Sequence, residues 1–321
     1  MGRRNLLLCF DAFGTLFKPR QPIAEQYAAV ARECGLNGFT TEQLQAAFKT
    51  AFSGESKAHP NYGRATGMGA EKWWTNVIHK TFQHLIGASR KLPEALAPRL
   101  LHRFSSREGY SLAPQVDSLL RSLKHRRQQQ QRSSIAVGVI TNSDDRVPSI
   151  LSSLGLRVSP LRFGSSIKPV DPSSHDEYDI DLLCLSYDVG FAKPDRRIFD
   201  AAEDMANQLL PAAAAQEEGK PVRVSNSGPA TEDAASLLKL YVGDEFEKDV
   251  VGARDAGWNA VFVGTDADIG GQDIDMLDLD RLDTSGLEEV FPDKDTSPVT
   301  IRADSTQAFL KWLIERSAAG G

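Results

Sequence analysis

The chain has 321 residues, and its 37 lysines and arginines against 43 aspartates and glutamates give a formal net charge of −6. This length suits one large domain or two smaller ones, and the mild acidity argues against a nucleic-acid or membrane-surface binder, because no basic field attracts phosphates. Three scattered cysteines, which fit neither a disulfide framework nor a zinc site, favour a reducing compartment.

The N-terminal apolar stretch ends at Asp11, which is too early for the apolar core and cleavage site of a secretory signal. No apolar run approaches the roughly 20 residues that a bilayer-spanning helix needs. We therefore expect an intracellular protein, cytoplasmic or nuclear, that is not secreted. Its expected partner is a small anionic substrate, with no nucleic acid and no membrane, and its oligomeric state is left open.

Five short apolar runs are typical of strands that are buried on both faces of a sheet. They are Leu6–Phe10, Ile135–Ile140, Leu182–Leu185, Leu238–Val242 and Ala260–Val263. Helical patterns accompany the later runs, at Val116–Leu123, Val147–Leu154, Arg196–Leu210, Asp249–Ala256 and Thr306–Arg316. This alternation predicts an α/β fold with a doubly wound, Rossmann-like parallel sheet.

The long stretch between the first strand and Val116 has helical patterning and almost no strand patterning. The expected helices are Ile23–Cys34, Thr41–Phe52 with Thr41 as its cap, Gly69–Leu85 and Pro93–Phe104. We predict an all-helical cap of residues 21–107, inserted after the first strand into a core of residues 1–20 and 108–321. The cap would cover the strand ends, and Trp73 and Trp74 are expected to pack within it rather than to contact substrate.

Three later segments have the polar or low-complexity composition of surface insertions. They are Arg126–Arg132, Lys168–Asp181 and Pro211–Glu232. A pattern that begins at Asp266 hints at a calcium-binding loop, but Gly270 displaces a ligand and Leu277 stands where that loop needs a bidentate glutamate.

Polar residues follow four of the strands, at the edge where a parallel α/β sheet places its chemistry. The segments are Asp11-Ala12-Phe13-Gly14-Thr15-Leu16, Thr141-Asn142-Ser143, Ser186–Asp195 and Gly243–Asp249. They predict a site for covalent chemistry on an anion, with Asp11 as the nucleophile and Lys193 balancing substrate charge. Asp244 and Asp11 would hold a hard cation, with Mg²⁺ as the expected cofactor, while Asp249 would orient Lys193 or hold a metal-bound water.

The four motifs in this order, with the inserted helical cap, resemble the haloacid dehalogenase superfamily of hydrolases. Within it, Pro60-Asn61-Tyr62-Gly63 followed by Trp73-Trp74 is similar to the group called haloacid dehalogenase-like hydrolase domain-containing protein three. The resemblance implies that Asp11 is the nucleophile and that Thr141 and Lys193 bind the transferred group. It also implies that Asp244 is a metal ligand. Substrate contacts are expected from five further residues: Gly14, Thr15, Asn142, Asn61 and Tyr62.

Phe13 departs from the phosphatases of this superfamily, whose first motif is Asp-x-Asp with the second aspartate as general acid and base. Phe13 cannot exchange a proton, and such help is worth about 10²–10⁴ in rate. Glu245, Asn61 or Tyr62 would have to replace it. In the phosphatases the second aspartate also ligates the metal through its backbone carbonyl, which Phe13 retains, so Phe13 stays a candidate metal ligand.

Three functions remain open. The favoured one is a Mg²⁺-dependent phosphohydrolase on a small phosphorylated metabolite, which is slow or depends on another acid or on a good leaving group. The second is a metal-independent 2-haloacid dehalogenase, because those enzymes carry an aromatic residue where Phe13 stands and a halide leaves without a proton. Against it, Asp244 with Asp249 is the phosphatase arrangement, and no cap arginine matches theirs. The third is a non-catalytic protein that binds phosphate and metal.

Overall fold

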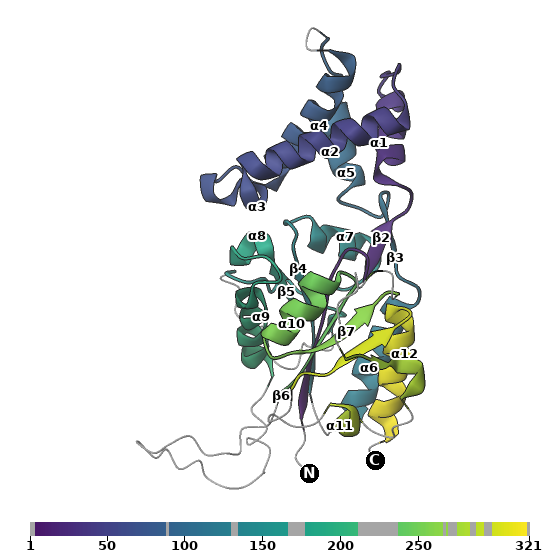
Figure 1. Cartoon of the computed structure of the whole chain (residues 1–321), viewed down its shortest axis with the longest axis vertical. Helices are drawn as coiled ribbons and strands as arrows, with labels where there is room; N and C mark the ends of the chain where they lie inside the picture. The colour runs from purple at the N-terminus through teal and green to yellow at the C-terminus, as the bar shows by residue number, and fades with distance from the viewer. Residues whose placement is uncertain are drawn as a thin grey trace.

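The computed structural model describes residues 4–87, 90–129, 134–165, 177–210, 237–265, 268, 275–282, 287–291 and 297–319. Figure 1 shows a sheet core with helices on its faces and a separate group of helices beyond one end of the sheet. The predicted insertion Pro211–Glu232 lies outside the described residues, as do 130–132 and 168–176 of the other two insertions.

Within the described residues, the core is a seven-stranded parallel sheet with the strand order β5-β4-β1-β6-β7-β9-β8. In that order the strands are Leu182–Leu185, Ile135–Thr141, Asn5–Phe10, Leu237–Gly243, Asn259–Val263, Thr300–Ala303 and Leu277–Asp278. The predicted α/β fold and its five strands are thereby confirmed. β9 and β8 were not predicted, because they are short and contain charged residues that interrupt an apolar run. Arg302 of β9 donates to Asp278 of β8 at 2.8 Å.

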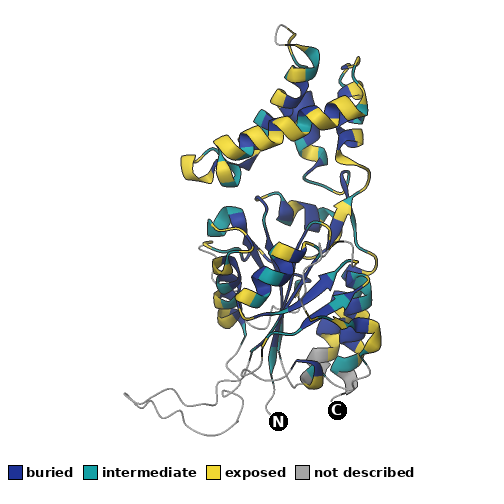
Figure 2. Ribbon diagram, viewed as in Figure 1, coloured by how far each residue is buried: buried dark blue, intermediate teal, exposed yellow. Residues whose placement is uncertain are grey.

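Each face of the sheet has its own core, because successive side chains of β1 point to opposite faces. Leu6, Leu8 and Phe10 pack with residues of α6 (Val116–Gln129) and α12 (Thr306–Ala319). Leu7 and Cys9 pack with α9 (Arg196–Leu209) on the other face. Figure 2 shows the buried interior of these layers. The remaining core helices are α7 (Val147–Ser153), α8 (Ser186–Val189), α10 (Gly252–Asp255) and α11 (Leu287–Val290).

Two predicted segments of the core differ from the structure. Arg126–Gln129 continues α6 as helix instead of forming the predicted loop, because arginine and glutamine are good helix formers. The predicted helix Asp249–Ala256 begins earlier, as a π-helical turn at Phe246–Val251, and then continues as α10. Such turns are frequent at functional sites.

The described end of the predicted insertion Lys168–Asp181 is also not a surface loop. Asp179 is fully buried, and its carboxylate accepts from Arg121 at 2.9 Å and from Arg157 at 2.8 Å. Asp181, at the entry to β5, is only 2% exposed. These buried charges connect the sheet edge to α6, which a polar composition alone does not reveal.

The cap contains the helices α1 (Ile23–Glu33), α2 (Thr41–Ala58), α3 (Pro60–Gly63), η1 (Arg64–Thr66), α4 (Ala70–Ile86) and α5 (Leu96–Arg103). The N-cap of α2 is Thr40 rather than the predicted Thr41. The Thr40 hydroxyl accepts from the Gln43 N–H at 3.2 Å, and the Gln43 side chain accepts from the Thr40 N–H at 2.8 Å.

A two-stranded antiparallel ribbon joins the cap to the core (Figure 1). Its strands, β2 (Phe17–Pro19) and β3 (Tyr110–Leu112), have three residues each and are too short for the sequence pattern to show. The cap bounds 21–107 stay a prediction. Among the helices described, none combines the length and apolar character that crossing a membrane requires.

Candidate active site

A buried lysine, Lys193, follows β5 and contacts side chains that follow β1 and β6. Lys193 Nζ lies 3.0 Å from Oδ1 of Asp11, which follows β1, and 2.7 Å from Oδ1 of Asp249, which follows β6. Its side chain is 1% exposed. Burial disfavours the charged ammonium, but the carboxylates of Asp11 and Asp249 outweigh it and raise the pKa of Lys193. The structure thus brings the predicted nucleophile and the predicted cation into direct contact.

Two polar side chains hold Lys193 in this position. Asn142 accepts from the Lys193 N–H at 2.7 Å and donates to the Lys193 carbonyl at 2.9 Å. The Tyr241 hydroxyl accepts from Lys193 Nζ at 2.6 Å and donates to the carbonyl of Ile140 at 2.8 Å. Asn142 lines the pocket, but its amide is used to position Lys193, and its predicted substrate contact stays a prediction. The sequence analysis did not single out Tyr241. A tyrosine within the apolar run Leu238–Val242 could have indicated it, because a buried tyrosine hydroxyl usually has a hydrogen-bond partner.

The π-helical turn fixes the other side of Lys193. Asp249 Oδ2 accepts from the Glu245 N–H at 2.8 Å, which leaves Oδ1 for Lys193. Burial raises the pKa of Asp249, and the charge of Lys193 opposes that change. Asp249 therefore contacts Lys193 directly, and its role, whether orienting Lys193 or holding a metal-bound water, stays a prediction.

Three carboxylates converge at this end of the site. One oxygen each from Asp11, Asp244 and Asp249 lies within 4.8 Å of the others. Burial raises the pKa of Asp244 to about 6; a hydrogen bond from the Thr15 hydroxyl at 2.8 Å opposes this, and the charges of Asp11 and Asp249 add to it. Converging carboxylates fit a hard divalent cation such as Mg²⁺, which takes oxygen ligands. The contribution of the Phe13 carbonyl stays a prediction.

Gly14 and Thr15 contact the side chain of Asp244 and are not among the residues that line the pocket. Gly14 has φ 81°, and a Cβ at this position would lie 2.0 Å from Oδ2 of Asp244. Thr15 is 1% exposed, and its hydroxyl is used by Asp244. Neither residue belongs to the pocket lining, so the structure does not bring these two predicted substrate contacts to the cavity.

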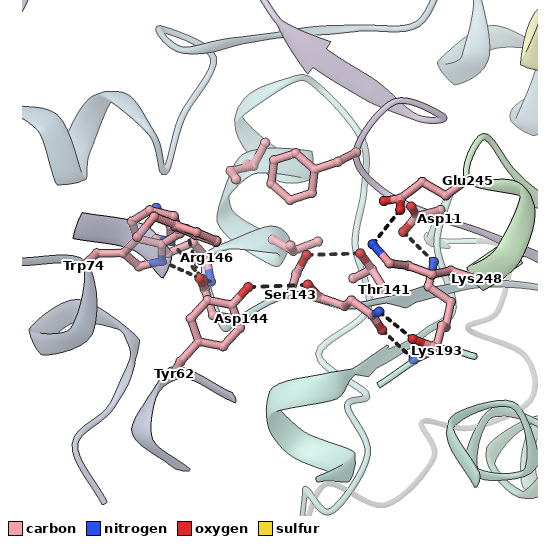
Figure 3. Close-up of a pocket in the computed structure, with 15 residues that line it drawn as sticks. Asp11, Tyr62, Trp74, Thr141, Ser143, Asp144, Arg146, Lys193, Glu245 and Lys248 are labelled. Carbon is pink, nitrogen blue, oxygen red and sulfur yellow. Dashed lines mark hydrogen bonds and ion pairs between the residues drawn. The ribbon is translucent and has the colours of Figure 1, made fainter. Parts of the chain in front are cut away.

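A cavity of about 250 Å³ lies between the strand ends and the cap (Figure 3). In this view Asp11 and Lys193 lie at one end, Thr141 and Ser143 lie in the middle, and Trp74 lies at the far end. The hydroxyls of Thr141 and Ser143 share a hydrogen bond of 3.1 Å. The lining residues are Asp11, Phe13, Phe52, Tyr62, Trp74, Thr141, Asn142, Ser143, Asp144, Arg146, Val147, Ile150, Lys193, Glu245 and Lys248.

The far end of the pocket holds an ion pair that the sequence analysis missed. Arg146 donates from Nε and Nη2 to the two oxygens of Asp144 at 2.8 and 2.9 Å, and Trp74 Nε1 donates to Asp144 at 2.7 Å. The guanidinium lies 4.3 Å from the centroid of the Trp74 ring. Trp73 and Trp74 both pack within the cap as expected, with Trp73 buried and the ring centroids 4.9 Å apart, but Trp74 also lines the pocket. The only signal for the ion pair is its place directly after the motif Thr141-Asn142-Ser143.

The tip of the cap contacts the core through Asn61 and Tyr62. Asn61 donates to the Ser186 carbonyl at 2.8 Å, and the Tyr62 hydroxyl donates to the Asn142 carbonyl at 3.3 Å. Both residues have positive φ, 48° and 56°, a conformation that persists only where the surroundings hold it. Tyr62 lines the pocket, and its predicted substrate contact stays a prediction, whereas Asn61 is not a lining residue and instead connects the cap to the core.

Phe13 faces both the pocket and the ribbon that carries the cap. Its ring makes edge-to-face contacts with Phe17 at 4.6 Å and Tyr110 at 5.6 Å between centroids. Of the residues considered as substitutes for the absent acid, Tyr62 is engaged with a backbone carbonyl, and burial raises its pKa. The carboxylate of Glu245 lines the pocket but is ion-paired with Lys248 at 2.5 Å.

Comparison with known proteins places this arrangement in a family. Residues 6–257 match the model of the haloacid dehalogenase-like hydrolases. An uncharacterised hydrolase of Schizosaccharomyces pombe is 29% identical over 80% of this chain and 89% of its own length. Haloacid dehalogenase-like hydrolase domain-containing protein 3 of Homo sapiens is 28% identical over 80% of this chain and 81% of its own length.

A solved structure, the defluorinating L-2-haloacid dehalogenase Rha0230, superposes with a TM-score of 0.53 at 12% identity, covering 97% of this chain and 95% of that one. This likeness concerns the fold alone. The family model spans most of the chain and includes Asp11, Thr141, Lys193 and Asp249. The chain therefore belongs to the haloacid dehalogenase-like hydrolases.

Proposed function

We propose that the chain is a Mg²⁺-dependent phosphohydrolase that transfers the phosphoryl group of a small phosphorylated metabolite to Asp11 and then to water. The observation that carries this proposal is the contact of Lys193 with both Asp11 and Asp249, next to the carboxylate of Asp244. A buried ammonium beside a nucleophilic carboxylate can balance the charge of a phosphoryl oxygen. The family membership supports a hydrolase, and the carboxylate set supports the metal.

In this proposal each side chain has a defined task. The N–H of Ala12 donates to Oδ1 of Asp11 at 2.8 Å, which aims the other carboxylate oxygen for attack on phosphorus. Lys193 and the hydroxyl of Thr141 would hold the phosphoryl oxygens. Asp11 and Asp244 would hold Mg²⁺, which supplies neutralising charge at the transferred group when bound.

Phe13 slows both steps of the proposed reaction, the transfer of the phosphoryl group to Asp11 and the hydrolysis of the aspartyl-phosphate. The leaving group departs without a proton from position 13, and no base at that position activates water against the aspartyl-phosphate. The second half needs water activation whatever the leaving group is. We therefore expect a burst of leaving-group release of about one equivalent per chain, followed by slow turnover.

The test uses the full chain with 4-nitrophenyl phosphate. We expect a Mg²⁺-dependent burst, a phosphorylated Asp11 detectable by mass spectrometry, and loss of both in Asp11→Asn or with a chelator. Phe13→Asp should raise the steady rate by about 10²–10⁴, and Phe13→Ala, which removes the same ring contacts but adds no acid, should not. If no phosphate is transferred to Asp11 from any phosphomonoester, the proposal is wrong.

The aromatic residue at position 13 favours one alternative, a 2-haloacid dehalogenase, because a halide leaves without a proton. Halide release from 2-chloropropionate that survives a chelator would establish this alternative in place of the phosphohydrolase. Saturable vanadate binding with neither product would instead establish a non-catalytic phosphate-binding protein.

A further inference from the structure

The cavity has two chemically different halves. The inner half carries the charged groups Asp11 and Lys193, and the outer half is walled by aromatic and aliphatic side chains. These outer residues come from the first strand end, the cap and α7: Phe13, Phe52, Tyr62, Trp74, Val147 and Ile150. A phosphoryl group held at Asp11 would place the rest of its substrate in the outer half. The small volume, about 250 Å³, limits that part to a compact group.

The charges of the outer half are already paired with one another. Arg146 is bidentate on Asp144, and the two side chains are only 15% and 3% exposed. Trp74 adds a third hydrogen bond to Asp144 and covers the guanidinium. At the rim, Lys248 is paired with Glu245. Among the lining residues that the structure describes, no unpaired ion is therefore presented to a second charged group of a substrate.

The polar groups next to the aromatic side chains are also already hydrogen-bonded within the protein. The amide of Asn142 is used by the backbone of Lys193, and the hydroxyl of Tyr62 is used by the carbonyl of Asn142. A polyhydroxylated leaving group would lose its water and find few partners, which costs binding energy. A flat, uncharged ring would instead stack on the aromatic side chains.

Phe13 points to the same kind of leaving group for a separate reason. Without an acid at position 13, the oxygen that leaves phosphorus has to depart as an anion. A phenol has a pKa of about 10, whereas water, which alcohols resemble, has a pKa of about 15.7. A phenolate therefore leaves unprotonated far more readily than an alkoxide.

We propose that the site takes aryl phosphomonoesters whose ring carries no second charge, with the ring stacked in the aromatic outer half of the cavity. The bond between phosphorus and the phenolic oxygen breaks, the phenolate leaves with the electron pair, and Asp11 forms a bond to phosphorus. Water then attacks phosphorus, which restores Asp11 and yields phosphate, and its protons end on the phenolate and the phosphate. This inference rests on the proposed phosphohydrolase function.

The experiment measures the second-order rate of Asp11 phosphorylation in the full chain with Mg²⁺. Three donors are compared: phenyl phosphate, 4-carboxyphenyl phosphate and acetyl phosphate. The carboxylated phenol is the better leaving group of the two phenols, so chemistry alone would favour 4-carboxyphenyl phosphate. We expect it to react about 10-fold more slowly than phenyl phosphate, because its second charge finds no free partner.

Two matched variants test the aromatic wall. Phe52 lines the pocket, whereas Phe39, a half-buried phenylalanine of the same cap, does not. Phe52→Leu should lower the ratio of the phenyl phosphate rate to the acetyl phosphate rate by about 2- to 10-fold. Phe39→Leu should leave that ratio at the wild-type value.

The possible results separate the inference from the proposed function. If acetyl phosphate modifies Asp11 but 4-carboxyphenyl phosphate equals or exceeds phenyl phosphate, the inference is overturned and the phosphohydrolase stands. An unchanged ratio in Phe52→Leu overturns it in the same way. If none of the three donors modifies Asp11, the proposed function itself fails, and the inference falls with it.

Discussion

Replacement of Gly14 by alanine tests the support behind the carboxylate cluster. A Cβ at this position would lie 2.0 Å from Oδ2 and 2.4 Å from Cγ of Asp244. Ordinary contact begins at about 3.4 Å, so the carboxylate has to move by about 1.4 Å. Gly257 offers a matched control, because its φ of 78° is close to the 81° of Gly14 but nothing lies within 4 Å of its Cβ position. Both variants pay the same left-handed backbone cost, about 1–2 kcal/mol.

Only Gly14→Ala should therefore affect metal binding. Mg²⁺ demands near-ideal geometry with ligands at about 2.0–2.1 Å, so a displacement of this size would remove Asp244 from the proposed ligand set. We expect Mg²⁺ affinity to fall by at least about 10–100-fold, the loss typical when a supporting contact of a ligand is removed. The assay is calorimetric titration with Mg²⁺, with urea unfolding as a check on the shared backbone cost. Equal Mg²⁺ affinity in Gly14→Ala and Gly257→Ala would refute the reasoning.

Two further predictions concern stability. Burial of Asp179 disfavours its charge, but hydrogen bonds from Arg121 and Arg157 outweigh this and lower its pKa from the ordinary 3.8 to about 2. This shift should contribute about 2 kcal/mol to the free energy of unfolding above pH 4, and the contribution should be lost as the pH falls toward 2. The difference between the urea midpoints of wild type and Asp179→Asn should accordingly shrink below pH 4, and a constant difference would contradict the argument. Tyr241→Phe removes the hydroxyl that donates to the Ile140 carbonyl and accepts from Lys193 Nζ, and it should lower the free energy of unfolding in urea by about 1–3 kcal/mol, so an unchanged value would contradict these contacts.

The parts of the fold that the sequence predicts are those whose signal is local. A strand buried on both faces has to be a continuous apolar run, so β1 and β4 can be located to within one residue. β9 has only four residues and carries Arg302, which pairs with Asp278 of β8, and β2 and β3 have only three residues each. Their pairing depends on residues far apart in the chain, which no local pattern records.

In the candidate site too, residues with a local sequence signal can be predicted, and residues whose partners are distant in the chain cannot. Asp11 and Lys193 can be found because they stand directly after strands, where the fold itself brings them together. Tyr241 is hidden because its partner Lys193 is 48 residues away. The ion pair of Asp144 and Arg146 looks like two ordinary surface charges until the cap places Trp74 on it.

The balance of charge at the strand ends supports the proposed phosphohydrolase over the dehalogenase alternative. Asp11, Asp244 and Asp249 provide three carboxylates, and Lys193 provides one ammonium within their reach. With a pKa of about 6, Asp244 adds negative charge at pH 7 to a cluster that holds more carboxylates than ammonium groups. A dianionic phosphate next to it would be repelled unless a divalent cation also binds, whereas a metal-free dehalogenation has no use for Asp244. The carboxylate of Asp244, positioned by Gly14 and Thr15, therefore supports the proposed Mg²⁺ site, and we expect Mg²⁺ binding to persist even in Asp11→Asn.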